Sequence, residues 1–346
     1  MIKRTLMPYL LRDAGYYPVV TLTGPRQSGK TTLVKSCFPD HTYVSLEEPE
    51  NRTLAKEDPR GFLNRFGRRV IIDEVQRVPD LLSYVQSQVD QDVRPGQYIL
   101  TGSQNFLLME KVSQTLAGRC GVLHLLPFSR SELEGQPAPN LGKPVQIFAN
   151  ESTRLACWQL LRTGFYPRIH DRQIPPEIWL ADYLRTYVER DVRALVNIGD
   201  LETFERFLRL CAGRTGHILN CSGLACDCGI AVDTVRRWLS ILKTSFIVFL
   251  LKPHHRNFNK RLIKSPKLYF YDTGLACYLL GIRTDEQLQS HPARGALFEN
   301  LILSEAVKSY LHQRREPPLF FWRDQTGHEL DLLVDEAGEL YPVEIK

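Results

Sequence analysis

The chain has 346 residues, of which 43% are hydrophobic and 24% are charged, and its formal net charge is +5. These values are ordinary for a globular protein and leave room for two or three domains. The mild basic excess permits nucleic-acid binding without requiring it. The chain contains no apolar run of membrane-spanning length, and its eight cysteines show no disulfide rhythm. We therefore expect a cytoplasmic protein that does not act on a membrane.

The clearest motif is a glycine-rich stretch between a strand predicted over 17–22 and a helix predicted over 32–37. Residues 24–31 read GPRQSGKT and match the pattern G-x-x-x-x-G-K-[ST] at every fixed position. In such a loop, backbone N–H groups and a helix N-terminus hold phosphates, the lysine reaches the β- and γ-phosphates, and the next hydroxyl ligates Mg²⁺. The predicted phosphate-binding residues are Gly24, Pro25, Arg26, Gln27, Ser28, Gly29, Lys30, Thr31 and Thr32.

A second motif follows an apolar run. Residues 70–72 are Val-Ile-Ile, and they lead directly into Asp73 and Glu74. This pattern is typical of a buried parallel strand that directs two acids towards a bound nucleotide. We predict that Asp73 holds Mg²⁺ together with Thr31, and that Glu74 polarises the attacking water as a general base.

Two further polar residues are candidates for the same site. A strand predicted over 98–104 ends near Ser103. This side chain, or that of Gln104 beside it, can orient water or touch the terminal phosphate; plain strand termination is the alternative. Arg119 precedes a strand predicted over 121–125 and is a candidate charge-neutralising arginine, acting in cis or on a neighbouring subunit. A solvated arginine at a helix end is the alternative. The alternation of strands and helices predicts an α/β fold with a parallel, doubly wound sheet.

The middle of the chain is predicted to be helical. After a proline- and glycine-rich loop over 134–144, the pattern over 222–242 predicts a helix-turn-helix, and a strand over 246–251 begins a possible wing. The stretch 252–267 carries basic residues and no acid. A basic helix beside a basic wing suggests contact with a DNA backbone, while a lid or a protein-docking module is the alternative. The candidate DNA contacts are Arg236, Arg237, Arg256, Lys260 and Arg261.

The C-terminal stretch gathers carboxylates. A helix predicted over 295–311 carries Glu299, and two predicted strands carry Asp331 and the pair Glu344 and Lys346. This is the D…ExK layout of a metal-dependent nuclease, in which two carboxylates hold a divalent cation and a lysine activates water. The alternative is a cross-strand ion-pair cluster on a solvated face. Because Lys346 ends both the motif and the chain, we expect either that the protein continues or that this end lacks a supporting layer.

Together these stretches resemble a large prokaryotic family of AAA-superfamily P-loop ATPases that carry a C-terminal domain of unknown function. The resemblance rests on 24–33, 70–82, 99–108, 116–119, 183–192, 265–281, 295–300 and 328–346. It implies ATP and Mg²⁺ as cofactors, a sensor near Ser103 and an arginine at Arg119. It also implies a parallel AAA-type sheet flanked by helices, then a helical and winged-helix region, then a small α+β nuclease-like domain. The expected domains are 1–135 for the ATPase, 136–200 for a helical linker, 201–280 for the winged helix and 281–346 for a truncated nuclease-like domain.

Three functions stay open at this stage. The first is a Mg²⁺-dependent ATPase that moves its C-terminal half according to nucleotide state. The second is a DNA-binding or DNA-processing protein with a regulatory ATPase. The third is a protein-docking scaffold gated by nucleotide. Each is compatible with an oligomer.

Overall fold

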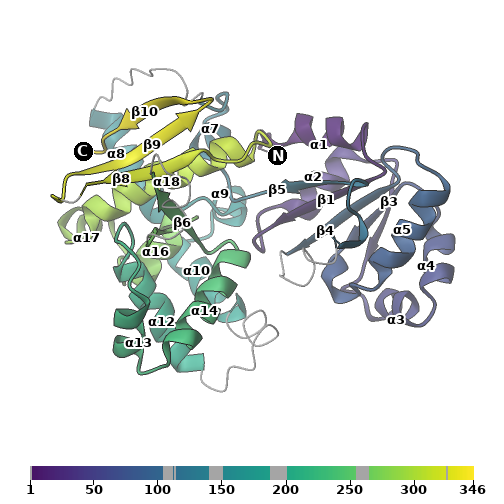
Figure 1. Cartoon of the computed structure of the whole chain (residues 1–346), viewed down its shortest axis with the longest axis horizontal. Coiled ribbons are helices and arrows are strands. Elements are labelled where there is room, and N and C mark those ends of the chain that lie inside the picture. Colours follow the sequence, from purple (N-terminus) through teal and green to yellow (C-terminus); the bar gives the residue numbers. More distant parts are fainter. Residues whose placement is uncertain are drawn as a thin grey trace. The chain divides into compact units, whose positions relative to one another are not determined.

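The computed structural model describes residues 2–103, 112, 114–139, 151–187, 201–254, 265–324 and 326–346 (Figure 1). The chain forms two compact units. Unit 1 comprises Met1–Phe128, Glu132–Pro137 and Leu311–Arg315, and unit 2 comprises Ser129–Ser131, Ala138–Tyr310 and Glu316–Lys346. The chain therefore passes from one unit to the other several times.

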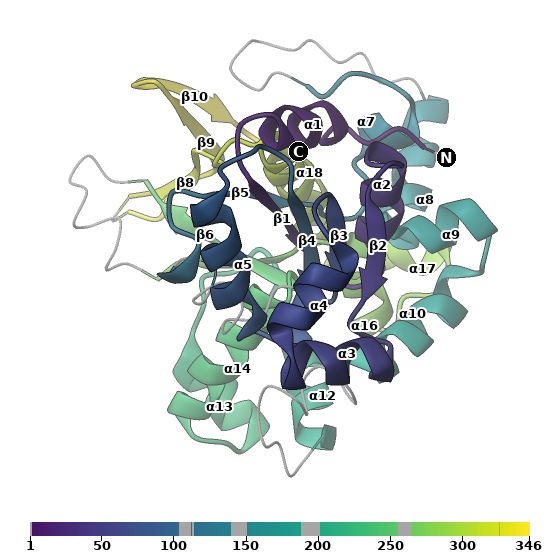
Figure 2. The ribbon, with the colours of Figure 1, turned by 90° about the vertical axis from the view of Figure 1, so that its right-hand side faces the viewer.

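Unit 1 is built on a five-stranded sheet in the order β2-β3-β4-β1-β5, and its strands pair in parallel (Figure 2). The strands are β1 Val19–Gly24, β2 Thr42–Ser45, β3 Val70–Asp73, β4 Tyr98–Ser103 and β5 Cys120–His124. The helical elements are α1 Met7–Ala14, α2 Lys30–Cys37, α3 Pro49–Glu57, α4 Pro59–Phe66, η1 Val75–Arg77, α5 Leu81–Gln91 and α7 Arg130–Leu133, the last of which crosses into unit 2. This arrangement confirms the predicted α/β sheet.

Both faces of this sheet are covered by helices. Ile71 packs with the apolar residues of α1 and α2, whereas its neighbours Val70 and Ile72 pack with those of α4 and α5. Successive strand residues point to opposite faces, so a strand buried on both sides reads as a continuous apolar run. This explains why the Val-Ile-Ile run preceding Asp73 is a reliable sign of a central strand.

Strand β1 lies where the strand order reverses. The connection after β1 leads away to β2 at one edge, whereas the connection after β4 passes over β1 to β5 at the other edge. Ligands of open α/β sheets bind outside the carboxyl ends of the strands at such a point. The glycine-rich loop follows β1 directly and therefore occupies this position.

Unit 2 combines helices with a second five-stranded sheet in the order β10-β9-β8-β6-β7. Its strands are β6 Val248–Pro253, β7 Lys267–Phe270, β8 Leu319–Arg323, β9 Glu329–Glu336 and β10 Glu339–Val343. Its helices are α8 Glu151–Thr163, α9 Pro167–Arg172, α10 Pro176–Thr186, α12 Leu201–Gly213, α13 Cys221–Cys228, α14 Val232–Thr244, α16 Thr273–Leu279, α17 Asp285–Ser290 and α18 Arg294–Leu311.

The predicted helix-turn-helix segments are present as helices. Asn220 accepts a hydrogen bond from the Gly223 N–H and caps α13, and Gly229 ends that helix with φ of 69°. At the predicted wing, β6 pairs antiparallel with β7, and it also pairs parallel with β8. The winged helix stays a prediction. The second sheet joins β6 and β7, which precede residue 280, to β8, β9 and β10, which follow it. The domain bounds stay a prediction. Among the described helices, none is long and apolar enough to cross a membrane.

Candidate active site

The loop between β1 and α2 has the backbone of a tight anion-holding turn. Gly24, Gln27 and Gly29 have φ of 152°, 63° and 92°. A Cβ at position 24 would lie 2.1 Å from the carbonyl oxygen of Leu125, so only glycine fits beside β5. Close packing of this glycine against β5 fixes where the loop begins.

Two polar side chains lie inside the loop. Lys30 is 7% exposed, and its ammonium donates to the carbonyl oxygens of Gly24 at 3.0 Å and Pro25 at 2.7 Å. Ser28 is fully buried, and its hydroxyl has no hydrogen-bond partner among the residues that the structure describes. A buried hydroxyl without a partner is costly, and a phosphate oxygen would supply the missing acceptor.

Asp73 meets the loop from the end of β3. The Thr31 hydroxyl donates to its Oδ2 at 2.9 Å, so the structure brings this predicted pair together. The Tyr43 hydroxyl donates to the same oxygen at 2.8 Å, and the Thr101 hydroxyl donates to Oδ1. Burial, together with the bond to Asp73, raises the pKa of Tyr43. The two extra donors come from β2 and β4, and no local motif marks them.

The pair of Thr31 and Asp73 fits the magnesium ion that the phosphate-binding motif implies. A hydroxyl and a carboxylate are hard oxygen ligands, and Mg²⁺ is commonly held by one or two carboxylates together with substrate phosphates. Three hydroxyl groups around Asp73 show that its carboxylate is surrounded by polar groups rather than by apolar side chains. The donor set suits a hard cation.

Glu74 has a left-handed backbone, with φ of 59°, at the point where β3 turns into η1. Its N–H donates to Asp73 Oδ1 at 3.1 Å, and its carboxylate accepts a hydrogen bond from the Gln76 amide. Gln76 therefore orients the predicted base. This role could not be predicted, because a glutamine two residues after an acid has no diagnostic spacing.

Ser103 lies at the carboxyl end of the parallel strands, whereas Arg119 lies at their amino end. Ser103 ends β4 and is opposite Gly24 in the β1–β4 register, so its backbone lies beside the loop. Arg119 precedes β5, and its carbonyl oxygen accepts from the Val19 N–H at 3.3 Å, at the start of β1. The Arg119 side chain pairs with Asp90. A cis role on the phosphates does not fit this position, whereas a role towards a neighbouring subunit stays a prediction.

A histidine beside the loop was not predicted. His124 ends β5, and its Nδ1 lies 2.7 Å from the hydroxyl oxygen of Thr23. Burial lowers the pKa of His124 to about 4. The imidazole is therefore neutral at physiological pH and acts as a hydrogen-bonding partner for the end of β1.

In unit 2, Glu299 belongs to a different arrangement from the one predicted. The ammonium of Lys267 lies 3.1 Å from Glu299 and also pairs with Glu329, and the Tyr269 hydroxyl donates to Glu299. Lys267 is 2% exposed. Burial lowers its pKa, but the hydrogen bond to Glu329 and the charges of both glutamates outweigh this effect and raise it overall. A protein cation thus lies among these acids.

The other predicted nuclease residues lie near the end of the chain. Asp331 in β9 accepts a hydrogen bond from the Ile345 N–H at 2.9 Å, which brings it beside the predicted motif. Glu344 and Lys346 follow β10, pair with each other at 3.2 Å and are largely exposed. Among the described residues, no group of three or more His, Cys, Asp or Glu side chains is placed to hold a metal ion. The nuclease-like site stays a prediction.

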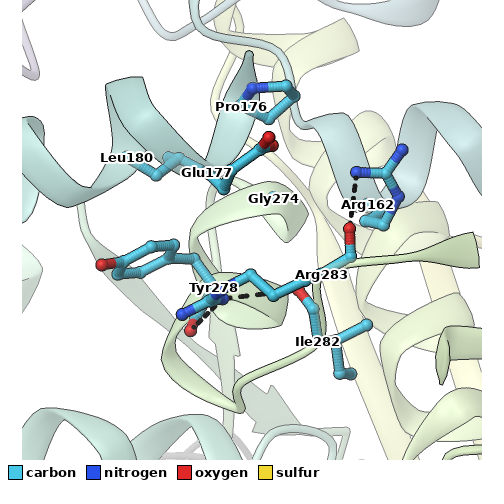
Figure 3. Close-up of a pocket in the computed structure, with 8 residues that line it drawn as sticks. All are labelled: Arg162, Pro176, Glu177, Leu180, Gly274, Tyr278, Ile282 and Arg283. Atoms are coloured by element: carbon cyan, nitrogen blue, oxygen red, sulfur yellow. Dashed lines mark hydrogen bonds between the residues drawn. The ribbon is translucent and has the colours of Figure 1, made fainter.

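The candidate DNA contacts are only partly described. Arg236 and Arg237 are exposed on α14, and Arg236 pairs with Asp233 at 2.9 Å. Arg256, Lys260 and Arg261 lie outside the described residues. Unit 2 also contains a small pocket of about 10 Å³ beside α10 and α16, where Arg162 donates to the Arg283 carbonyl (Figure 3). Ligand pockets for drug-sized molecules are far larger, typically about 300–1,000 Å³, and none of the residues that line this pocket belongs to the phosphate-binding loop.

Comparison with known proteins agrees with the geometry of the loop. Residues 16–134 match the model of the AAA domain, and residues 155–286 and 294–346 match two domains of unknown function, DUF8612 and DUF4143. The uncharacterized proteins Rv2008c of Mycobacterium tuberculosis and Mb2031c of Mycobacterium bovis are each 34% identical over 333 residues, which cover 95% of this chain and 70% of theirs. The Walker-type ATPase PABY2304 of Pyrococcus abyssi is 16% identical with a TM-score of 0.49, covering 81% of this chain and 96% of that one.

The phosphate-binding loop, the acid pair and the matched domain define the N-terminal part as a P-loop ATPase domain of the AAA type. The chain belongs to the family of the mycobacterial proteins Rv2008c and Mb2031c.

Proposed function

We propose that this protein binds ATP and hydrolyses it with Mg²⁺ at the carboxyl edge of the unit 1 sheet. The observation that carries the proposal is the 2.9 Å hydrogen bond from Thr31 to Asp73. It joins the two motifs, which are distant in sequence, at the one edge of the sheet where ligands of this fold bind. Adenine is preferred over guanine because the matched domain is of the AAA type.

Each residue at this edge has a separate task. The N–H groups of the loop and the N-terminus of α2 hold the phosphates, and the Ser28 hydroxyl is available as a donor. Lys30 turns from its own loop carbonyls to the β- and γ-phosphates. When bound, Mg²⁺ neutralises charge on the phosphate oxygens, and Thr31 and Asp73 hold it.

Glu74 acts as the general base in this proposal. The Gln76 amide fixes its carboxylate, and the left-handed backbone turns the side chain away from the path of β3. A positioned base contributes about 10²–10⁴-fold to a proton transfer. Glu74 takes a proton from water as the water attacks the terminal phosphorus. The bond from that phosphorus to the β-phosphate oxygen breaks, and ADP leaves.

Equilibrium binding of a fluorescent ATP analogue tests the site. Lys30→Ala should remove the ammonium from the loop and weaken binding by at least about a hundredfold, as expected for a charge-assisted contact to phosphate. Lys56→Ala, at an exposed position on α3, is the matched control and should bind like wild type. Equal binding by both variants would overturn the proposal.

We further propose that nucleotide state alters the behaviour of unit 2, which then binds DNA or a protein partner. The exposed Arg236 and Arg237 on α14 support DNA as the first candidate. A mobility-shift titration at low and high salt tests it, with Arg237→Gln against Arg172→Gln, an exposed arginine on α9. Absence of a shift at low salt would exclude DNA and favour a docking scaffold, which predicts ATP turnover insensitive to DNA.

Nucleic-acid cleavage by unit 2 is a weaker candidate. Lys267 lies between Glu299 and Glu329, so those acids already have a cation. Asp331, Glu344 and Lys346 alone support the hypothesis. Metal-dependent cutting of DNA that disappears in Asp331→Ala would favour it, and cutting that persists in that variant would exclude this site.

A further inference from the structure

A short segment that begins at the last residue of α18 belongs to the ATPase unit, whereas its chain neighbours do not. Residues Leu311–Arg315 belong to unit 1, although Tyr310 and Glu316 on either side belong to unit 2. Within this segment, His312 is 1% exposed and the Arg314 guanidinium pairs with the buried Asp13 of α1. A segment this short needs such specific contacts to stay in place.

The buried Arg4 connects this region to the phosphate-binding loop. Its guanidinium donates to three acceptors: the Ser28 carbonyl oxygen at 2.9 Å, the Leu126 carbonyl oxygen at 2.6 Å and Glu132 Oε1 at 3.2 Å. Arg4 also lies over the ring of Phe128, 4.7 Å from its centroid. Burial lowers the pKa of Arg4 and the charge of Glu132 opposes this, so the pair is stable only while both partners stay in place.

Glu132 and His312 complete the network. Glu132 Oε1 accepts from the Thr5 N–H at 2.7 Å and lies 3.4 Å from His312 Nδ1. His312 Nε2 accepts from the Leu126 N–H at 3.2 Å. Because Nε2 is an acceptor, the ring carries its proton on Nδ1, the nitrogen that faces the carboxylate.

Two residues of this network lie beside places where the chain passes between the two units. Glu132 is the first residue of unit 1 after the crossing at Ser131, and His312 follows the crossing at Tyr310 by two residues. Arg4 contacts Ser28, whose buried hydroxyl has no hydrogen-bond partner in the described part of the chain. One set of buried bonds therefore joins the predicted phosphate site to two places where the chain enters unit 2.

We propose that Arg4, Glu132 and His312 are positioning residues that hold the Ser28 peptide, so that nucleotide binding at the loop changes the protection of both crossings. The proposal rests on the nucleotide site proposed above. When a phosphate binds the Ser28 hydroxyl, the Ser28 peptide shifts, and the hydrogen bond from Arg4 to the Ser28 carbonyl oxygen changes its length. Glu132 and His312 respond because a buried charged network does not tolerate a partly broken set of bonds.

Two measurements on the full chain test the proposal. The first is hydrogen–deuterium exchange of the wild type with and without a non-hydrolysable ATP analogue. We expect added protection over 24–31 and also over 129–137 and 308–316. The second is the affinity for a fluorescent ATP analogue and the steady-state KM and kcat of Arg4→Lys and His312→Gln, with the exposed Lys3→Ala as the control.

Arg4→Lys keeps the charge but loses the fork that reaches three acceptors, so binding should weaken about tenfold, the scale for losing one buried charged hydrogen bond. His312→Gln keeps an acceptor for Leu126 and should weaken binding about fivefold. KM should rise more than kcat falls in both variants, which general loss of folded protein would not produce. Lys3→Ala should match wild type.

The outcomes are distinct. Protection of the loop without any change at the two crossings, or unchanged affinity in both variants, would overturn the coupling and leave the nucleotide site intact. Absence of protection over 24–31 in the wild type would overturn the nucleotide site itself, and the coupling with it. The exchange measurement needs no variant, so it decides the matter even if Arg4→Lys fails to fold.

Discussion

The Thr31 hydroxyl lies 2.9 Å from Asp73 Oδ2, and this contact joins the phosphate-binding loop to the acid at the end of β3. The Tyr43 hydroxyl shares the same oxygen from the far side of β3, in the edge strand β2. Asp73 is therefore held from several strands at once, which fixes the carboxylate without relying on a single neighbour.

Replacing Asp73 by asparagine should separate metal binding from nucleotide binding. The amide keeps acceptor capacity towards Thr31 and Tyr43 but loses the negative charge that a hard cation needs. We expect Asp73→Asn to bind the ATP analogue in EDTA as wild type does, and to lose the added affinity that Mg²⁺ confers. Phosphate release should fall at least about a hundredfold, the scale of losing one preorganised electrostatic contact.

The matched control for this experiment is Asp40→Asn, at an exposed position beyond α2. It should leave both affinity and turnover unchanged. A normal response of Asp73→Asn to Mg²⁺ would contradict the assignment of this acid as a metal ligand.

His124 should make unit 1 sensitive to acid. Its pKa is lowered by burial from 6.5 to about 4, so the unfolded chain takes up a proton in a range where the folded chain does not. The free energy of unfolding that the neutral His124 contributes is fully present above about pH 6.5 and is lost as pH falls towards 4. Between pH 7.5 and pH 5 the loss from this group should be about 2 kcal/mol.

Exchange of the slowest amides in β1 and β5 measures this effect, because it reports the opening free energy of the strands themselves. His124→Asn keeps a polar partner for Thr23 and does not titrate in this range. Between pH 7.5 and pH 5, the opening free energy of the variant should therefore fall by about 2 kcal/mol less than that of the wild type. An identical pH dependence in both proteins would show that burial of His124 is not the cause.

Lys267→Met should destabilise unit 2 strongly. The change removes the buried cation that Glu299 and Glu329 share, although Arg323 stays 3.6 Å from Glu329. Breaking a buried pair in this way typically costs about 3–5 kcal/mol. All four tryptophans belong to unit 2, so their fluorescence during urea unfolding reports on this unit. The second change Glu329→Gln should recover part of the loss, whereas a cost below about 1 kcal/mol in the single variant would contradict the described cluster.

The contiguous motifs could be predicted because their chemistry depends on neighbours in sequence. The loop over 24–31 carries its glycines, lysine and hydroxyl within one turn, and Val70–Asp73 carries its own burial pattern. Where Asp73 meets Thr31 also follows from the sequence, since parallel strands end at one edge.

Contacts between distant residues that belong to no motif could not be predicted. Arg4 meets Glu132 only because the fold brings together segments 128 positions apart, and neither residue has a motif. The apolar run at 246–251 predicts a strand but not all of its partners, and β6 pairs with β8 as well as with β7. Arg119 follows a glycine, as a catalytic arginine can. Whether it lies at the amino or the carboxyl end of the strands depends on the direction of β5 in the sheet.

ATP turnover by the wild type and by Glu74→Gln, with binding of the ATP analogue measured on the same samples, tests the central claim most directly. The claim predicts measurable phosphate release from the wild type, retained binding in Glu74→Gln, and release reduced at least about a hundredfold in that variant. Unchanged phosphate release in Glu74→Gln would contradict it.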